Sequence, residues 1–313
     1  MTNNKIIKNL ICPEGKIDVV LDTDAYNEID DQFALSYLVK RDDKINLKGI
    51  LAAPFLNTRS TSPKEGMEKS YDEIIKLLTL LKREDLKKTV FRGSEYFLKS
   101  EEEPVISDAA NYLSVLAMEY STDKPLYVVA IGAITDVASA LLIKPEIADR
   151  IVVVWLGGHG DHINNPTSEF NMVQDIAAAR VVFSSGAPLV QLPCLGVVSQ
   201  LSISKYELIH WLKGKGDLCD YLADNAIEEA DSYAEGKPWT RVIWDLAAAI
   251  WLVNDGGRFL RERIIPTYMP GYDGEYHKAD FDRPMKYIFH IERDAIIEEM
   301  IRVLTDECNN SSH

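Results

Sequence analysis

The sequence is organised around one acidic stretch, Asp22-Thr23-Asp24-Ala25-Tyr26-Asn27-Glu28-Ile29-Asp30-Asp31, which holds four aspartates and a glutamate in ten residues. The apolar and mostly β-branched run at residues 17–21 directly precedes it and predicts a buried strand. Apolar side chains then recur at helical spacing, at Ile29, Phe33, Ala34, Tyr37 and Leu38. The acidic stretch is therefore expected on the turn that joins a strand to a helix.

Carboxylates packed this closely repel one another unless a cation neutralises them. Because all the candidate ligands are hard oxygens, they favour Ca²⁺ or Mg²⁺ over softer metals. Asp30 and Asp31 also fall in the first turn of the expected helix, where the helix dipole favours negative charge. The alternative is a solvated acidic loop with an aspartate that caps the helix. The apolar strand directly before the cluster favours the metal site.

Outward from this stretch, strands and helices alternate along the chain. Further strands are predicted at residues 45–53, 89–91, 126–131, 151–156, 189–192, 264–265 and 287–291. Helices are predicted at residues 67–82, 107–117, 175–182, 204–234, 239–253 and 293–304. This alternation predicts an α/β fold with an open, mostly parallel sheet and helices on both faces.

In such a fold the ligand lies outside the carboxyl ends of the strands. The acidic stretch directly follows one strand. Asn57, Ile131, Gly157-Gly158 and Pro193 follow or end others. We therefore expect all of these residues to converge on one edge of the sheet.

Composition restricts the class of protein. The 313 residues are 46% hydrophobic, without a linker-like segment or internal repeat, which predicts a single domain over 1–313. A formal net charge of −15 argues against nucleic acid or an anionic membrane as partner. The cysteines are scattered, which indicates reduced thiols in a cytoplasmic protein: Cys12, Cys194, Cys219 and Cys308. No signal-peptide core or membrane-spanning run is expected.

The acidic stretch resembles the Asp-rich motif of the inosine-uridine-preferring nucleoside hydrolase family, which reads DxDPGxDD. Five residues separate Asp24 from Asp30 here, two more than in that motif, so the match is to a lengthened variant. The resemblance implies a Rossmann-like nucleoside hydrolase fold. It also implies Ca²⁺-dependent hydrolysis of the N-glycosidic bond of ribonucleosides, with a small nucleoside as substrate.

Two later blocks extend the resemblance. Glu169-Phe170-Asn171 resembles the family's EFN block, in which Glu and Asn bind the ribose hydroxyls. Trp244-Asp245-Leu246-Ala247-Ala248 resembles the block whose Asp binds the metal. The alternatives are ordinary polar residues before a helix for the first block and a helix-capping Asp245 for the second. A carboxylate with neighbours as apolar as those of Asp245 is costly unless it is paired or bound to metal.

Two weaker matches complete the expected site. The segment at residues 129–136 resembles the family's TGPLTN block, with Ile131 in place of the Thr whose carbonyl binds the metal. A carbonyl ligand does not require a particular side chain, so this substitution is tolerable. Asn57, after the second strand, matches a ribose-binding Asn, although the loop length differs.

The main departure from the family is at the residue before Asp245. Many members have a His there that protonates the leaving base, whereas this chain has Trp244. Purine-preferring members can have Trp in that place, and an aromatic ring could stack on a purine. Trp244 could instead be a core residue. His159, or else His162, is an alternative proton donor.

The resemblance thus implies a division of roles. Asp24, Asp31, Asp245 and the Ile131 carbonyl hold Ca²⁺, and Asp24 is also the general base. Asp30, Asn57, Glu169 and Asn171 bind the sugar, and Asp22 is expected to support the site through hydrogen bonds to loop amides. Trp244 or His159 assists the leaving base. A homodimer or homotetramer is expected.

Two other functions compete with this one. The Asp22-Thr23-Asp24 triplet after a strand also fits a DxD phosphatase of the haloacid dehalogenase type. That chemistry would leave Asp30-Asp31 and Glu169-Phe170-Asn171 unexplained. The other competitor is a non-catalytic nucleoside or sugar sensor on the same fold, because a fold does not determine a function.

Overall fold

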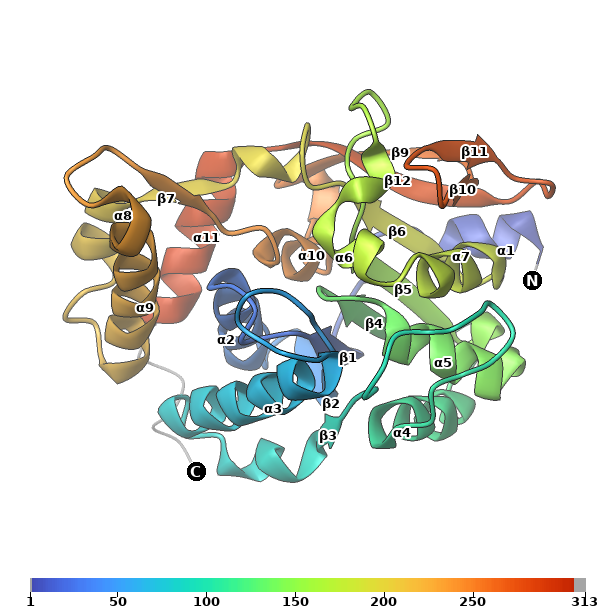
Figure 1. Ribbon diagram of the computed structural model, residues 1–313, viewed down its shortest axis with the longest axis horizontal. Helices are drawn as coiled ribbons and strands as arrows, with labels where there is room; N and C mark the ends of the chain where they lie inside the picture. The colour runs from blue at the N-terminus through green and yellow to red at the C-terminus, as the bar shows by residue number, and fades with distance from the viewer. Residues whose placement is uncertain (1, 307–313) are drawn as a thin grey trace.

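An eight-stranded sheet runs through the centre of the computed structural model, which describes residues 2–306 (Figure 1). In spatial order its strands are β3 (Val90–Arg92), β2 (Ile45–Ala52), β1 (Ile17–Thr23), β4 (Leu126–Ala130), β5 (Ile151–Leu156), β6 (Leu189–Leu192), β12 (Pro284–Ile291) and β9 (Leu260–Pro266). All neighbours are parallel except β9, which is antiparallel to β12 at one edge. The predicted α/β fold with a mostly parallel sheet is confirmed.

The order of the strands determines where a ligand can bind. The chain builds outward from β1 through β2 to β3, and then crosses back to β4 and continues through β5 to β6 in the opposite direction. The direction therefore reverses between β1 and β4. In open α/β sheets this reversal opens a crevice at the carboxyl ends of the two strands.

Helices cover both faces of the sheet and bury two separate apolar clusters. On one face lie α1 (Asn3–Asn9), α2 (Asp30–Lys40), α3 (Pro63–Leu80), α8 (Lys205–Trp211), α9 (Asp217–Ala234), α10 (Leu246–Trp251) and α11 (Arg293–Thr305). On the other lie α4 (Asp108–Leu116), α5 (Thr135–Ile143), α6 (Phe170–Gln174) and α7 (Ile176–Ser184). Short 3₁₀ helices are η1 (Glu84–Thr89), η2 (Ala117–Glu119), η3 (Pro145–Asp149), η4 (Pro166–Ser168), η5 (Val198–Gln200) and η6 (Asp255–Gly257).

Strand β1 shows why these sequences form buried strands. Val19 and Leu21 belong to the first cluster, whereas Val20 between them belongs to the second. Because successive side chains of a strand point to opposite faces, a strand covered on both faces must be apolar at every position. This requirement explains the continuous apolar runs in the sequence.

Two small ribbons lie outside the main sheet. Strand β7 (Ser202–Ser204) pairs with β8 (Thr240–Val242), and β10 (Tyr268–Pro270) pairs with β11 (Tyr276–Lys278), both antiparallel. The ribbon β7–β8 corrects one prediction, since residues 239–253 were expected to be a single helix. Thr240 and Val242 are β-branched, and pairing with β7 holds them extended, so the helix α10 begins only at Leu246.

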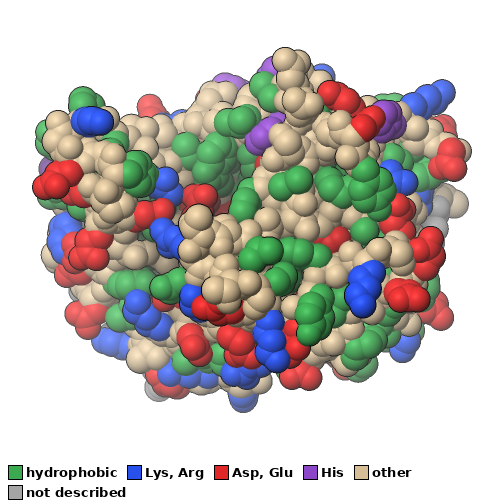
Figure 2. Space-filling model, viewed as in Figure 1, with side chains coloured by type: hydrophobic (Ala, Val, Ile, Leu, Met, Phe, Trp, Pro, Cys, Tyr) green, Lys and Arg blue, Asp and Glu red, His purple; other side chains and the backbone are tan. Residues whose placement is uncertain are grey.

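The face of the molecule shown in Figure 2 carries charges of both signs. On the face in Figure 2, Asp and Glu side chains are scattered among Lys and Arg side chains. None of the helices within residues 2–306 combines the length and apolar character needed to cross a membrane. Cys12 and Cys194 are free thiols, the Cys219 thiol donates to the Leu304 carbonyl (3.4 Å), and Cys308 lies outside the described residues.

Candidate functional site

A pocket with a cavity volume of about 270 Å³ opens at the carboxyl ends of β1, β4, β5 and β6. It lies at the crevice that the reversal of strand order creates. Every predicted site residue except Asn57 lines it: Asp24, Asp30, Asp31, Ile131, His159, Glu169, Asn171, Trp244 and Asp245. Of the strand ends expected to converge, the acidic stretch and Ile131 line the pocket, whereas Gly157, Gly158 and Pro193 are replaced there by their neighbours Leu156, His159 and Cys194.

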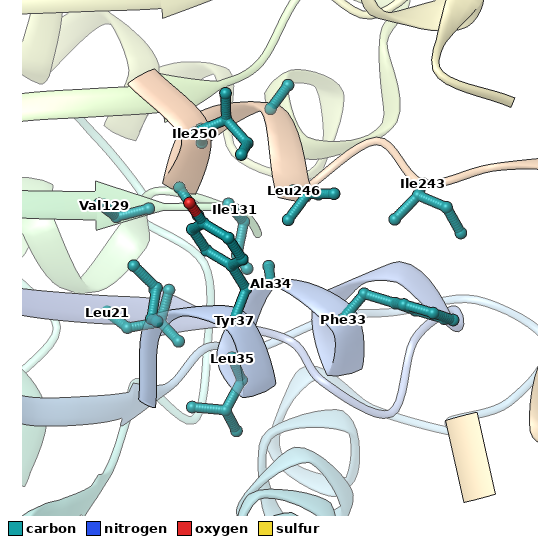
Figure 3. Packing of buried hydrophobic residues seen from close by; sticks show 14 of the residues in the cluster. Leu21, Phe33, Ala34, Leu35, Tyr37, Val129, Ile131, Ile243, Leu246 and Ile250 are labelled. Carbon is teal, nitrogen blue, oxygen red and sulfur yellow. The ribbon is translucent and has the colours of Figure 1, made fainter. Parts of the chain in front are cut away.

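The packing of α2 against α10 positions three of these carboxylates. Ala34 and Tyr37 of α2 point toward Leu246 and Ile250 of α10, whereas Leu35 points away from α10 (Figure 3). Asp30 and Asp31 occupy the first turn of α2, and Asp245 directly precedes α10. The apolar contact thus brings the N-terminal ends of two helices together, where both helix dipoles favour negative charge.

Asp30, Asp31 and Asp245 each offer a carboxylate oxygen within 4.8 Å of the others, and all three side chains are buried. The backbone N–H of Asp245 donates to Asp30 Oδ2 (3.4 Å), and the Thr23 hydroxyl donates to Asp31 Oδ1. Burial, with the charges of Glu28 and Asp31, raises the pKa of Asp30 well above the ordinary value, and burial with the charges of Asp30 and Asp31 does the same to Asp245. A divalent cation would relieve this repulsion, and carboxylate oxygens are suitable ligands for one.

Asp24 lies beside this cluster and is also buried. Burial, followed by the charges of Asp31 and Asp30, raises its pKa well above the ordinary value. Its Oδ2 has no hydrogen-bond partner among the described residues. Gly132 approaches the other oxygen so closely that an added Cβ would lie 2.9 Å from Asp24 Oδ1, which explains why a glycine follows Ile131.

Asn171 connects two strand ends through its amide. Its Nδ2 donates to the carbonyl oxygens of Ile131 and Leu156, each at 3.0 Å. Both amide hydrogens are therefore used, and Oδ1 remains as an acceptor for a ligand. The Ile131 carbonyl accepts this one bond and retains a second lone pair.

Glu169 has most of its acceptor capacity occupied by the protein. It caps α6 by accepting from the backbone N–H groups of Asn171 and Met172, both at 2.9 Å, and it accepts from the Gly158 N–H at 2.8 Å. The Cys194 thiol is a further hydrogen-bond partner, and burial raises the pKa of that thiol. Because a carboxylate offers about four acceptor positions, at most one remains for a sugar hydroxyl.

Two aromatic groups at the pocket were predicted to assist a leaving group. Trp244 is half-buried and packs against the apolar cluster, yet it also lines the pocket, so both interpretations of this residue have a structural basis. His159 Nδ1 accepts from the Leu195 backbone N–H (3.3 Å), and burial lowers the pKa of His159. The ring is therefore neutral near pH 7 and carries its proton on Nε2. His162 does not line the pocket.

The lengthened turn contributes pocket residues that the sequence did not identify. Asn27 and Glu28 both line the pocket. Asn57 lies behind them and does not line it, but its Nδ2 donates to Asn27 Oδ1 (2.6 Å). The sequence did contain a signal for these pocket residues. The turn between Asp24 and Asp30 is two residues longer than the family motif, and an insertion beside a ligand site adds side chains to that site. Phe170 also lines the pocket, although the motif had suggested only its two polar neighbours.

Asp22 differs from its predicted role. It was expected to bond to neighbouring loop amides, but neither of its carboxylate oxygens has a hydrogen-bond partner among residues 2–306. It is fully buried and faces Asp136, and burial together with the Asp136 charge raises its pKa well above the ordinary value. Loop amides are not available because Asp22 still belongs to β1 and pairs with its neighbours on both sides.

Comparison with known proteins identifies relatives of the chain. The family model described as inosine-uridine preferring nucleoside hydrolase matches residues 19–278. Pyrimidine-specific ribonucleoside hydrolase RihB of Escherichia coli (strain K12 / DH10B) is 36% identical over 74 residues. That match covers 23% of this chain and 24% of the relative, so the alignment spans about a quarter of the relative's length.

Solved structures agree on the fold over almost the whole chain. A plant nucleoside hydrolase, the PpNRh1 enzyme, superposes with a TM-score of 0.72 at 18% identity and covers 94% of this chain and 99% of its own. A purine-preferring ribonucleoside hydrolase from Gardnerella vaginalis gives a TM-score of 0.69 at 19% identity, with 92% and 98% coverage.

Proposed function

Because the chain belongs to the inosine-uridine preferring nucleoside hydrolase family, we propose that it hydrolyses the N-glycosidic bond of ribonucleosides in a Ca²⁺-dependent reaction. The observation that carries the proposal is the buried group of Asp30, Asp31 and Asp245 at the reversal of strand order, with Asp24 beside it. A buried carboxylate cluster of this kind is costly unless a cation neutralises it.

The residues fit a hard cation. Asp24, Asp31, Asp245 and the Ile131 carbonyl are the proposed ligands, and Asp30 lies close enough to contribute. The unpartnered Asp24 Oδ2 and the second lone pair of the Ile131 carbonyl support this set. When bound, Ca²⁺ would offset part of the negative charge of the cluster and acidify the attacking water.

Asp24 is the proposed general base. Its Oδ2 is buried and has no donor within residues 2–306, so it can accept a proton from a water in the pocket. As that water attacks the anomeric carbon, the glycosidic bond lengthens and the sugar develops positive charge. The surrounding carboxylates stabilise that charge electrostatically.

The sugar would be held by acceptors that face the pocket. Asn171 offers Oδ1 and Asp30 offers its carboxylate, and both suit hydroxyl donors. Glu169 contributes mainly by fixing Gly158 and the start of α6, with one acceptor position at most for a hydroxyl. Asn57 acts through Asn27, whose side chain it orients.

Trp244 and His159 are proposed to assist the leaving base. Trp244 would stack on it, which favours purines because they offer a larger ring surface. His159 would donate a hydrogen bond from Nε2. Purine preference is a proposal about this chain alone, since the names of its relatives include both pyrimidine-specific and purine-preferring enzymes. Cytoplasmic location and a homodimer or homotetramer belong to the same proposal.

An assay of ribose release from inosine, uridine and p-nitrophenyl riboside tests the function. We expect turnover of all three, with inosine above uridine, and its loss in Asp24→Asn. Binding of nucleosides without turnover would instead identify a sensor. Turnover of p-nitrophenyl phosphate without ribose release would identify a phosphatase.

A further inference from the structure

The charged groups that line the pocket are all acidic. Six carboxylates do so: Asp24, Glu28, Asp30, Asp31, Glu169 and Asp245. No lysine or arginine is among the lining residues within the described chain. The guanidinium of Arg241 reaches Glu28 at 3.0 Å and Glu229 at 3.6 Å, so its charge is balanced by these two glutamates. One divalent cation would neutralise only part of the remaining charge.

The excess negative charge favours a positively charged ligand. Charges interact more strongly in a site walled by protein than in water, because the effective dielectric constant there is lower. Trp244 and Phe170 also line the pocket, and aromatic faces attract cations. The acidic side chains and the aromatic side chains of the pocket therefore both favour a positively charged ligand.

Neither Trp244 nor His159, the two residues proposed to assist the leaving base, is a strong acid. Trp244 lines the pocket beside Asp245, and its indole has no proton acidic enough to transfer to a leaving base. His159 accepts at Nδ1 from Leu195 and is neutral near pH 7, so it can donate a hydrogen bond but is a poor acid. A neutral base that leaves with the electrons of the broken bond becomes an anion unless it gains a proton.

We infer that the preferred substrates are ribosides whose glycosidic nitrogen already carries a positive charge, such as pyridinium ribosides or ribosides of N7-alkylated purines. When the C1′–N bond breaks, its electron pair moves to that nitrogen and cancels the charge, so the base leaves neutral without a proton. Water adds to C1′ and releases one proton through Asp24. The products are ribose, neutral base and one proton.

This inference rests on the proposed function and can be separated from it by matched substrates. Nicotinamide riboside is compared with its reduced dihydro form, and 7-methylguanosine with guanosine, each rate being divided by its uncatalysed rate. The neutral p-nitrophenyl riboside needs no proton and reports hydrolysis as such. We expect kcat/KM to favour each cation over its neutral partner by about tenfold or more.

Glu28→Gln tests the charge directly, since glutamine can still accept a hydrogen bond from Arg241. The ratio of kcat/KM for nicotinamide riboside to that for p-nitrophenyl riboside should fall about five- to tenfold. The exposed Glu103→Gln should leave this ratio as it is in the parent. If p-nitrophenyl riboside is hydrolysed but neither cation exceeds its neutral partner, the inference is wrong and the proposed function stands. If no riboside is hydrolysed, both fail.

Discussion

Asp22 lies in β1 and Asp24 directly follows that strand, yet the structure gives the two side chains different surroundings. Asp24 lines the pocket with a free oxygen, whereas Asp22 is buried beneath it against Asp136. Asp24→Asn should lower kcat by about a hundredfold or more, because it removes the proposed base.

Asp22→Asn provides the matched control for that prediction. Burial, with the charge of Asp136, raises the pKa of Asp22 and so favours its protonated form, and an amide has nearly the same shape as a protonated carboxyl. We therefore expect a loss of less than about tenfold in kcat, as for a residue that only supports the site. Steady-state kinetics of both variants would refute this division of roles if the two losses were comparable.

The buried carboxyl of Asp136 makes the free energy of unfolding depend on pH. Burial raises the pKa of Asp136 to about 6, although Ser94 and Ser107 donate hydrogen bonds to it. The folded protein then binds more protons than the unfolded chain between about pH 4 and 6. The stability that the protonated Asp136 carboxyl contributes at low pH is therefore lost as the pH rises through this range.

Asp136→Asn should remove this loss of stability, because an amide does not ionise as the pH rises. The amide can also donate a hydrogen bond to Asp22. The substitution should raise the free energy of unfolding at pH 7 by about 1–3 kcal/mol and reduce its fall between pH 4 and 6. The exposed Asp72→Asn is the control. Thermal unfolding at a series of pH values measures the effect, and a variant less stable than the parent at pH 7 would contradict it.

Trp244→Ala separates the two interpretations of that side chain. If Trp244 stacks on the base, kcat/KM for inosine should fall by a factor equivalent to about 1–3 kcal/mol, with a smaller effect on p-nitrophenyl riboside. If Trp244 is only a core residue, kcat/KM should fall equally for both substrates. The cavity left by the truncated side chain should also lower the free energy of unfolding by about 3–5 kcal/mol. Kinetics with both substrates, together with a melting curve, distinguishes the outcomes.

At the scale of elements, the contact of α2 with α10 should couple stability to metal binding. Leu246 is fully buried between these helices, one residue after Asp245 (Figure 3). Leu246→Ala should cost about 2–5 kcal/mol of stability and weaken Ca²⁺ binding, because the cavity loosens the two helix ends that carry Asp30, Asp31 and Asp245. Val115→Ala, on an exposed position, should change neither.

Calorimetric titration with Ca²⁺, together with melting temperatures, measures both effects. A destabilised Leu246→Ala protein that binds Ca²⁺ as tightly as the parent would show that the contact does not position the carboxylates.

The strands could be predicted from the sequence because burial on both faces makes them continuously apolar. The β7–β8 ribbon could not, since Thr240–Val242 becomes a strand only through pairing with a segment nearly forty residues earlier. In the same way, the motifs identified residues at the strand ends, but the path of the lengthened turn put Asn27 and Glu28 at the pocket and Asn57 behind it. Local patterns do not encode such contacts between distant segments.

At the scale of the whole molecule, the order of the strands brings the motifs together. Asp24 follows β1 and Ile131 follows β4, which are neighbours only because the chain reverses direction between them. Glu169 and Asp245 come from much later segments, and both line the same pocket. Sequence reasoning could predict this meeting point from the fold class, but not the distances within it.

The single domain over 1–313 and the homodimer or homotetramer remain predictions. Light scattering coupled to size-exclusion chromatography measures the mass of the assembly, and we expect two or four times the 35.3 kDa of one chain. A mass equal to one chain would contradict the expected assembly.

Dependence of turnover on Ca²⁺ tests the central claim most directly. Protein freed of metal with a chelator, with the loss confirmed by elemental analysis, is assayed for ribose release from p-nitrophenyl riboside while Ca²⁺ is added back. The account predicts that activity is absent at first and returns in proportion to the binding of one Ca²⁺ per chain. Full activity in the metal-free protein, or no activity when the site is saturated with Ca²⁺, would contradict it.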